Sequence, residues 1–541
     1  MPACGKSVST ARRAPATAGE GNDAAGAPSG GEDAGTGGGG QALAGASAGS
    51  EGGVATDGGS SRGGFPAVEG GAAGEGGAPV GAAGMPSPSG PGLELSAITI
   101  AQSLEVTLMR AGLSLPLRER GAPLIAGKRA LVRAFVKLES GFVARELIGV
   151  LDLESPGGSD TLVDRRIISE SSEHDQLDST FSFAVEARDL EPDTKYRLRV
   201  LDADKQPLAR FPSDGFKPLV LEPSRNLNVV LVPMIANGIT PPSGRSEIDG
   251  VRRRLVQLYP VSEITLDVAA PLTLTKPLPP NGDDAWDNAL ETLLTARDEA
   301  GAPDDVFYYG MLTPAASYDA YCDDGCYLGL SYIGGPDSPY EHGSVGLTAF
   351  ADGSGATDAW DTLAHELGHA LGREHSPCGV DEDLDVGFPY PAGDLGTTFG
   401  FDQELQKLLD PRVYRDVMGY CTPVWVSDYT YRGLFESLAA IDEQPALRTW
   451  GIVYPEQLRV ARIGRAGATS WRADRTGKLG SNLRSVTLLD AAKRPLSVTH
   501  VRFRRLDHLP GGTVWLRAAD LAQSGAAWVD LRPLGGGLLP L

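Results

Sequence analysis

Hydrophobic and polar residues alternate in short runs between residues 93 and 225. An alternation with a period of two buries one face of a strand, and the Gly, Pro and Asp clusters between the runs supply turns. We therefore expect a β-sandwich-like domain over residues 93–225. The clearest runs are Leu104–Leu108, Ala130–Val136, Phe181–Val185 and Tyr196–Val200.

The pattern changes after residue 226, where apolar runs alternate with longer segments of helical periodicity. Strands are expected near 229–234, 264–268 and 306–310, and helices near 246–258 and 284–300. This mixed order predicts an α/β or α+β domain over residues 226–440.

Short β patterns return in the last hundred residues. Ser485–Leu489 and Thr513–Arg517 are examples, and they predict a small β domain over residues 441–541. The expected fold class is therefore multidomain: an α/β (α+β) domain flanked by all-β, sandwich-like domains.

Residues 1–92 are rich in Gly, Ala, Ser and Pro, and hold a large share of the 70 glycines of the chain. Such a segment cannot bury enough apolar surface to fold, so we expect a disordered tether. Cys4 follows a small residue, as in the tail of a bacterial lipoprotein signal. It is a candidate lipid anchor, although no apolar signal region precedes it and an ordinary cysteine is the alternative.

The formal net charge of −22 argues against nucleic acid and anionic lipid as partners, because both require basic patches. Contact with a membrane is expected only through Cys4. Acidity by itself favours solubility. Asp381, Glu382, Asp383 and Asp385 also offer the oxygen atoms that Ca²⁺ takes, although no calcium-loop pattern is present.

Four further cysteines lie in the second half of the chain. Cys322 and Cys326 flank a tight-turn sequence, while Cys378 and Cys421 follow two candidate functional motifs. Pairing Cys322 with Cys326 and Cys378 with Cys421 uses all four, as an oxidising compartment favours. The alternative is four reduced, buried cysteines.

The segment His365–His375 reads HELGHALGREH. Residues four apart share one face of a helix, so His365 and His369 can point at one ion. Gly372 can take a positive φ and end the helix, which lets the chain return with His375. Three neutral imidazoles and one open position describe a catalytic zinc site.

Glu366 follows the first of these histidines and can reach a water molecule at the metal. Zinc lowers the pKa of such a water to about 7 and polarises a carbonyl group. A carboxylate beside it can take the proton and pass it to a leaving amine. Glu366 is therefore the candidate general base for hydrolysis of a peptide bond.

The segment resembles the metzincin pattern HExxHxxGxxH, which comes with a methionine turn downstream. The sequence DVMGYC, which ends at Cys421, looks like that turn. The resemblance implies that Met418 forms an apolar floor under the zinc. It also implies that Tyr420 is a fifth ligand and oxyanion donor, because astacins and serralysins place a tyrosine there. The alternatives are a core methionine and a packed tyrosine.

The stretches after His375 and after Cys421 are similar to bacterial secreted metzincins related to the mucin-cleaving peptidases. The resemblance is strong over residues 365–431 and weak elsewhere, and it does not carry mucin over as a substrate. Residues 343–350 are expected to form an edge strand on which an extended peptide can pair. His342 next to it is either a cleft residue or a solvated loop histidine.

Together these features predict an extracellular or cell-surface zinc endopeptidase that hydrolyses protein or glycoprotein substrates. The alternative is a cell-surface binding or adhesion protein with a zinc-stabilised, catalytically weak scaffold. The intact Glu366 argues against the alternative, because a scaffold has no use for a general base at that position.

Overall fold

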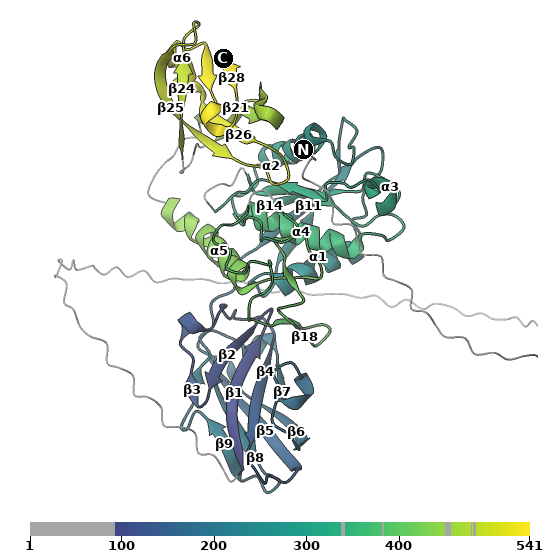
Figure 1. Ribbon diagram of the computed structural model, residues 1–541, viewed down its shortest axis with the longest axis vertical. Helices are drawn as coiled ribbons and strands as arrows, with labels where there is room; N and C mark the ends of the chain where they lie inside the picture. Colours follow the sequence, from purple (N-terminus) through teal and green to yellow (C-terminus); the bar gives the residue numbers. More distant parts are fainter. Residues whose placement is uncertain (1–91, 337–340, 381–383, 449–455, 478, 480–482) are drawn as a thin grey trace, which may run out of the picture. The chain divides into compact units, whose positions relative to one another are not determined.

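The computed structural model describes residues 92–336, 341–380, 384–448, 456–477, 479 and 483–541. The predicted tether with Cys4 lies outside these residues, and so do Asp381, Glu382 and Asp383 of the candidate calcium site. Figure 1 shows the succession of sheets and helices along the described chain.

The first part of the described chain is an all-β sandwich, as the alternating runs predict (Figure 1). One sheet has the strand order β3-β2-β1-β4-β7 and the other β10-β8-β5-β6, with β9 paired to β8; all pairs are antiparallel. The strands are β1 (Leu93–Ala101), β2 (Glu105–Arg110), β3 (Leu113–Ser114), β4 (Ala130–Leu138), β5 (Arg145–Ser155), β6 (Gly158–Ile168), β7 (Phe181–Val185), β8 (Lys195–Leu201), β9 (Pro207–Phe211) and β10 (Lys217–Pro218).

A mixed sheet follows, with the order β12-β11-β14-β16-β15 and with β13 also paired to β11. Its pairs are parallel except that β15 runs antiparallel to β16. The expected edge strand at 343–350 is therefore wrong, because β15 covers the outer side of β16. The strands are β11 (Asn228–Ile235), β12 (Thr265–Val268), β13 (Leu272–Thr273), β14 (Val306–Leu312), β15 (Gly329–Ser331) and β16 (Gly343–Leu347).

Five helices and two small ribbons accompany the mixed sheet. The predicted helices at 246–258 and 284–300 begin and end within one residue of the observed ones. The helices are α1 (Arg245–Leu258), α2 (Asp283–Glu299), α3 (Tyr318–Cys322), α4 (Ala356–Ala370) and α5 (Asp428–Arg448). The ribbon strands are β17 (Gly400–Asp402), β18 (Lys407–Leu409), β19 (Arg415–Asp416) and β20 (Val424–Trp425).

The C-terminal part forms an antiparallel sheet with the order β22-β21-β26-β25-β24-β27-β28, and β23 also pairs with β21. Its elements are β21 (Glu456–Ile463), β22 (Thr469–Trp471), β23 (Arg475–Gly477), β24 (Arg484–Leu489), β25 (Pro495–Arg504), β26 (Gly512–Arg517), α6 (Ala518–Ser524), β27 (Trp528–Asp530) and β28 (Leu538–Pro540). The expected fold class, with β sheets flanking an α/β part, is confirmed.

Buried apolar clusters join these parts of the chain. One buried cluster joins the sandwich to the helices beside the mixed sheet, and Nε1 of Trp425 donates to the carbonyl of Ser103 at 2.8 Å. A second cluster joins the mixed sheet to Leu506 and Trp515 of the C-terminal part. The described residues all belong to one compact unit.

The domain limits at 225/226 and 440/441 remain predictions, and residue 440 falls inside α5. Within the described residues, no helix is both long and apolar enough to cross a membrane.

Candidate active site

Helix α4 carries the first part of the histidine motif. Its apolar residues Leu363, Leu367 and Ala370 are buried at helical spacing and hold the helix against the sheet. Helix α1 packs closely on it at Gly250, where a Cβ atom would meet the ring of Trp360 at 2.2 Å. The helix is thereby fixed in rotation, which decides where its histidines point.

Gly372 ends this helix. It has a φ of +87°, and a Cβ atom there would lie 3.2 Å from the carbonyl oxygen of Gly334. Both observations favour glycine, because other residues rarely adopt this conformation. The chain then turns back and brings His375 to the histidines of α4.

The three motif histidines meet at their Nε2 atoms. Nε2 of His369 lies 2.9 Å from Nε2 of His365 and 3.1 Å from Nε2 of His375. The side chains are buried, with exposed fractions of 7% for His365, 0% for His369 and 2% for His375. Three ring nitrogens from two segments therefore converge on one small, buried space.

Two backbone carbonyls decide how these rings are protonated. Nδ1 of His365 lies 2.7 Å from the carbonyl of Val417, and Nδ1 of His369 lies 2.6 Å from the carbonyl of Arg373. A carbonyl oxygen only accepts, so each Nδ1 donates and each Nε2 carries a lone pair. Two lone pairs that face each other at 2.9 Å repel, and a cation between them removes the repulsion. The residues therefore fit a bound metal ion.

The environment also keeps these rings neutral. Burial lowers the pKa of all three histidines, and the neighbouring histidines lower the pKa of His365 and His375 further. A neutral imidazole is the form that binds a metal.

Glu366 is buried beside the histidines, with 1% of its surface exposed. Its Oε2 atom makes no hydrogen bond to any described residue. Burial, followed by the Asp507 carboxylate, raises its pKa well above the usual range. A buried carboxylate without a full set of partners is costly, and such groups are typical of functional sites.

Met418 lies under the helix and is buried. A Cβ atom at Gly368 would approach its sulfur to 2.5 Å, so this glycine makes room for the methionine. The buried carboxylate of Asp416 accepts from the backbone N–H of Met418 at 2.9 Å and of Ser427 at 2.8 Å. This network fixes the turn whose Val417 carbonyl orients His365.

Tyr420 lies at the end of the same turn. Its hydroxyl is 3.1 Å from Nε2 of His375 and also contacts Nδ1 of His508. The structure therefore places this tyrosine at the histidine cluster, where a hydroxyl can act on a bound group.

The chain has two disulfides among its described residues, Cys322–Cys326 and Cys378–Cys421. The second ties the segment after His375 to the turn that contains Met418 and Tyr420. Both pairs are those expected from the positions of the four cysteines, and reduced cysteines are excluded for this structure.

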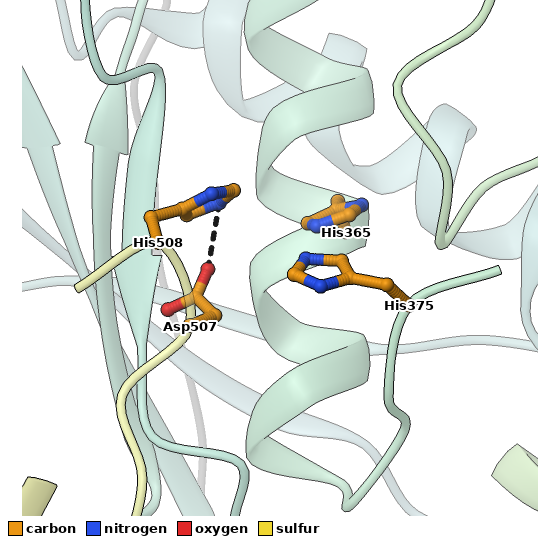
Figure 2. A group of neighbouring side chains, drawn as sticks. All are labelled: His365, His375, Asp507 and His508. Carbon is orange, nitrogen blue, oxygen red and sulfur yellow. Dashed lines mark ion pairs between the residues drawn. The ribbon is translucent and has the colours of Figure 1, made fainter. Parts of the chain in front are cut away.

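Two residues that the sequence analysis did not single out complete the cluster. Asp507 and His508 come from the loop between β25 and β26 and face His365 and His375 (Figure 2). The ligand atoms of these four residues all lie within 4.8 Å of one another. Oδ2 of Asp507 is 2.7 Å from Nε2 of His508 and 3.6 Å from Nε2 of His369.

The acid and the imidazole of this pair stabilise each other's charge. Burial disfavours a charged His508, but the Asp507 carboxylate outweighs it and raises the pKa of His508 to about 10. The pKa of Asp507 is lowered although burial opposes this, because His508 and His369 favour the carboxylate. No spacing rule connects residues 507 and 508 to the motif at 365–375, and only the tertiary structure shows the contact.

Residues 333–422 match a family model described as Peptidase M66. This stretch of the chain is similar to the peptidase M66 family. The match is to a metallopeptidase family, and the matched residues include the three motif histidines, Glu366 and Met418. Asp507 and His508 lie outside the matched residues.

Two solved structures show a weak likeness to this chain. One, described as the structure of a chaperone–substrate complex, is 15% identical over 48% of this chain and 40% of its own, with a TM-score of 0.22. The other, metalloproteinase-II from Bacteroides fragilis, is 14% identical over 59% of this chain and 85% of its own, also with a TM-score of 0.22. This chain thus spans about two fifths of the first structure. No curated protein matched the sequence.

His342, which lies among the residues that the family model matches, is neither solvated nor part of a cleft. It is 1% exposed, stacks on Phe307 and lies 2.7 Å from the carbonyl of Asp304 through Nδ1. The solvated-loop interpretation is therefore wrong, and the ring belongs to the packing of the sheet.

Asp385 is the one described member of the candidate calcium site. Its Oδ2 accepts from the hydroxyl of Tyr429 at 2.9 Å, and its Oδ1 accepts from the backbone N–H of Gly387 at 2.8 Å. These bonds satisfy both oxygens of the carboxylate, and the calcium site stays a prediction.

Proposed function

We propose that this protein is a zinc-dependent endopeptidase of the metzincin type that hydrolyses peptide bonds in protein or glycoprotein substrates. The observation that carries the proposal is the convergence of three Nε2 atoms beside the buried Glu366. The peptidase M66 match over residues 333–422 supports it.

His365, His369 and His375 would hold the zinc ion. When bound, zinc supplies a Lewis acid that acidifies water and polarises the scissile carbonyl. The carbonyls of Val417 and Arg373 hold two of the imidazoles in the tautomer that zinc requires. An imidazole-only set suits zinc over magnesium or calcium, which prefer oxygen ligands.

Glu366 would act as the general base and then as the acid. It follows His365 on α4, and its backbone carbonyl accepts from the hydroxyl of Ser344 at 3.1 Å, which fixes its place on the sheet. A raised pKa suits this role, because the carboxyl must both accept a proton from water and release it to the leaving amine.

Tyr420 would donate a hydrogen bond to the oxyanion that forms on the scissile carbonyl. Its hydroxyl lies beside His375 at 3.1 Å, within reach of a group held between the three histidines. Met418 would provide the apolar floor, since its buried side chain packs under α4 at Gly368.

We further propose that the protein acts outside the cytoplasm, at the cell surface or in the medium. The two disulfides support this, because such bonds persist in oxidising compartments. Lipidation of Cys4 would hold the protein at the membrane.

The direct test is proteolysis of an unfolded protein mixture by the zinc-loaded full chain and by Glu366→Gln. We expect the wild type to cleave and the variant to be about 10²–10⁴-fold slower, while both bind one zinc per chain. Equal rates would show that Glu366 is not the base. Zinc binding without cleavage in either protein would favour the binding or adhesion function.

A further inference from the structure

The edge of the mixed sheet next to the candidate active site is already paired. Strand β15 is the edge strand, and the chain beyond it continues to Ile333. The N–H of Ile333 donates to the carbonyl of Arg505 at 3.2 Å, and the N–H of Asp507 donates to the carbonyl of Ser331 at 3.1 Å. Tyr332 and Leu506 form an antiparallel bridge between these bonds. The segment Arg505–Asp507 is thus added to the sheet as one more short strand.

This edge lies next to the candidate general base. At Gly329 of β15, a Cβ atom would lie 2.3 Å from Oε1 of Glu366. An extended peptide that pairs with an edge strand is held by main-chain hydrogen bonds. Such a peptide would need the same N–H and carbonyl groups of Ser331 and Ile333 that Arg505–Asp507 now occupies.

Asp507 places its side chain into the catalytic cluster. It is fully buried; its Oδ1 accepts from the N–H of Ser331, and its Oδ2 lies 3.6 Å from Nε2 of His369. Nε2 of His508 is 3.5 Å from Oε1 of Glu366. A carboxylate beside three imidazoles completes a set of four protein ligands, which is typical of a closed zinc site.

The C-terminal sheet anchors this segment firmly. Leu506 is fully buried, and the buried carboxylate of Glu341 accepts from Nε of Arg502 at 3.0 Å and from Nε of Arg504 at 3.1 Å. His508 has a φ of +56°, a left-handed conformation that is uncommon for a residue other than glycine. The loop is therefore held in a defined and partly strained conformation at the site.

We propose that residues 505–508 are an intramolecular inhibitor that lowers the activity of the full chain, and that cleavage becomes faster when this loop leaves the edge of β15. The loop occupies both the peptide-binding edge and, through Asp507, the fourth position at the histidines. The inference rests on the proposed peptidase function and adds a regulation of the same site. Activation would require displacement of this C-terminal loop.

The test compares the zinc-loaded full chain with Asp507→Ala and Asp507→Asn, which keeps an acceptor for the N–H of Ser331. Asp490→Ala is the matched control, because Asp490 is an acid of the turn between β24 and β25 that pairs with Arg494. Three quantities are measured: the rate of peptide cleavage, the affinity for a peptide hydroxamate that is not hydrolysed, and amide hydrogen exchange over residues 329–336.

Both Asp507 variants are expected to bind the hydroxamate at least about tenfold more tightly than the wild type and the control, and to exchange faster at residues 329–336. Their rate of cleavage should rise by a similar factor. Unchanged affinity and exchange would overturn the inference. A fall in cleavage with unchanged exchange would also overturn it, since Asp507 and His508 would then belong to the catalytic machinery.

The outcome separates this inference from the proposed function. Tighter hydroxamate binding and faster exchange without any cleavage would support the inhibitory loop and contradict the peptidase function. Equal, Glu366-dependent cleavage in wild type and variants would support the peptidase function and overturn the loop.

Discussion

His342 shows how a single buried residue links this fold to pH. Burial, helped by the charge of Arg297, lowers its pKa to about 3 from an ordinary value of 6.5. Below pH 6.5 this histidine is therefore protonated in the unfolded chain but stays neutral in the folded chain. The stability from this group is full above pH 6.5 and is lost as the pH falls toward 3.

We expect His342→Gln to remove this part of the acid sensitivity. Between pH 7 and pH 4.5, the free energy of unfolding of the wild type should fall by about 2.5 kcal/mol more than that of the variant. Denaturant unfolding at the two pH values measures the difference. Parallel pH dependence in both proteins would mean that His342 is already charged in the fold.

Single residues also decide which ring nitrogens are protonated inside the histidine cluster. The sequence predicts that His365, His369 and His375 share a site, but it does not say which nitrogen faces inward. That answer comes from the carbonyls of Val417 and Arg373, which belong to segments that the motif does not specify.

Among the secondary-structure elements, the junction between α4 and the segment of His375 determines whether the third histidine lies beside the other two. Gly372→Ala introduces a Cβ atom at a φ of +87° and at 3.2 Å from the carbonyl of Gly334. We expect a loss of about 1–2 kcal/mol in the free energy of unfolding and weaker zinc binding, because His375 is displaced.

Gly353→Ala is the control for this prediction. Gly353 also has a positive φ, of +79°, but a Cβ atom there meets nothing within 4 Å. The Gly353→Ala variant should lose only the stability that the backbone conformation costs, and its zinc affinity should be unchanged. If both variants bind zinc as the wild type does, the sharp stop at Gly372 is not what positions His375. Thermal unfolding and calorimetric zinc titration measure the two effects.

Periodicity predicts well those elements whose sequence signals lie within the element itself. Helices α1 and α2 were predicted within one residue because apolar spacing and acidic first turns lie within each segment. The edge strand of the mixed sheet is not predicted correctly, because β15 has only three residues and its place depends on pairing with β16. The sequence of β15 carries too little periodicity to reveal this pairing.

For the whole molecule, the sequence predicted the succession of β, α/β and β parts but not how the last part meets the site. Asp507 and His508 lie more than a hundred residues beyond the motif, in a β domain without a recognisable signal of its own. Their contact with Glu366 and His369 depends on the burial of Leu506 and on the pairing of Arg505–Asp507 with the edge of β15. Such a contact is a property of the assembled chain.

In the proposed function, one zinc ion at the three histidines makes this chain a peptidase. Titration of the metal-free full chain with zinc, followed by cleavage of an unfolded protein, is the measurement that tests this role of zinc. We predict that cleavage appears with zinc and saturates at one ion per chain, and that His369→Ala abolishes both the binding and the cleavage. Cleavage by the metal-free protein, or unchanged zinc binding in His369→Ala, would contradict the account.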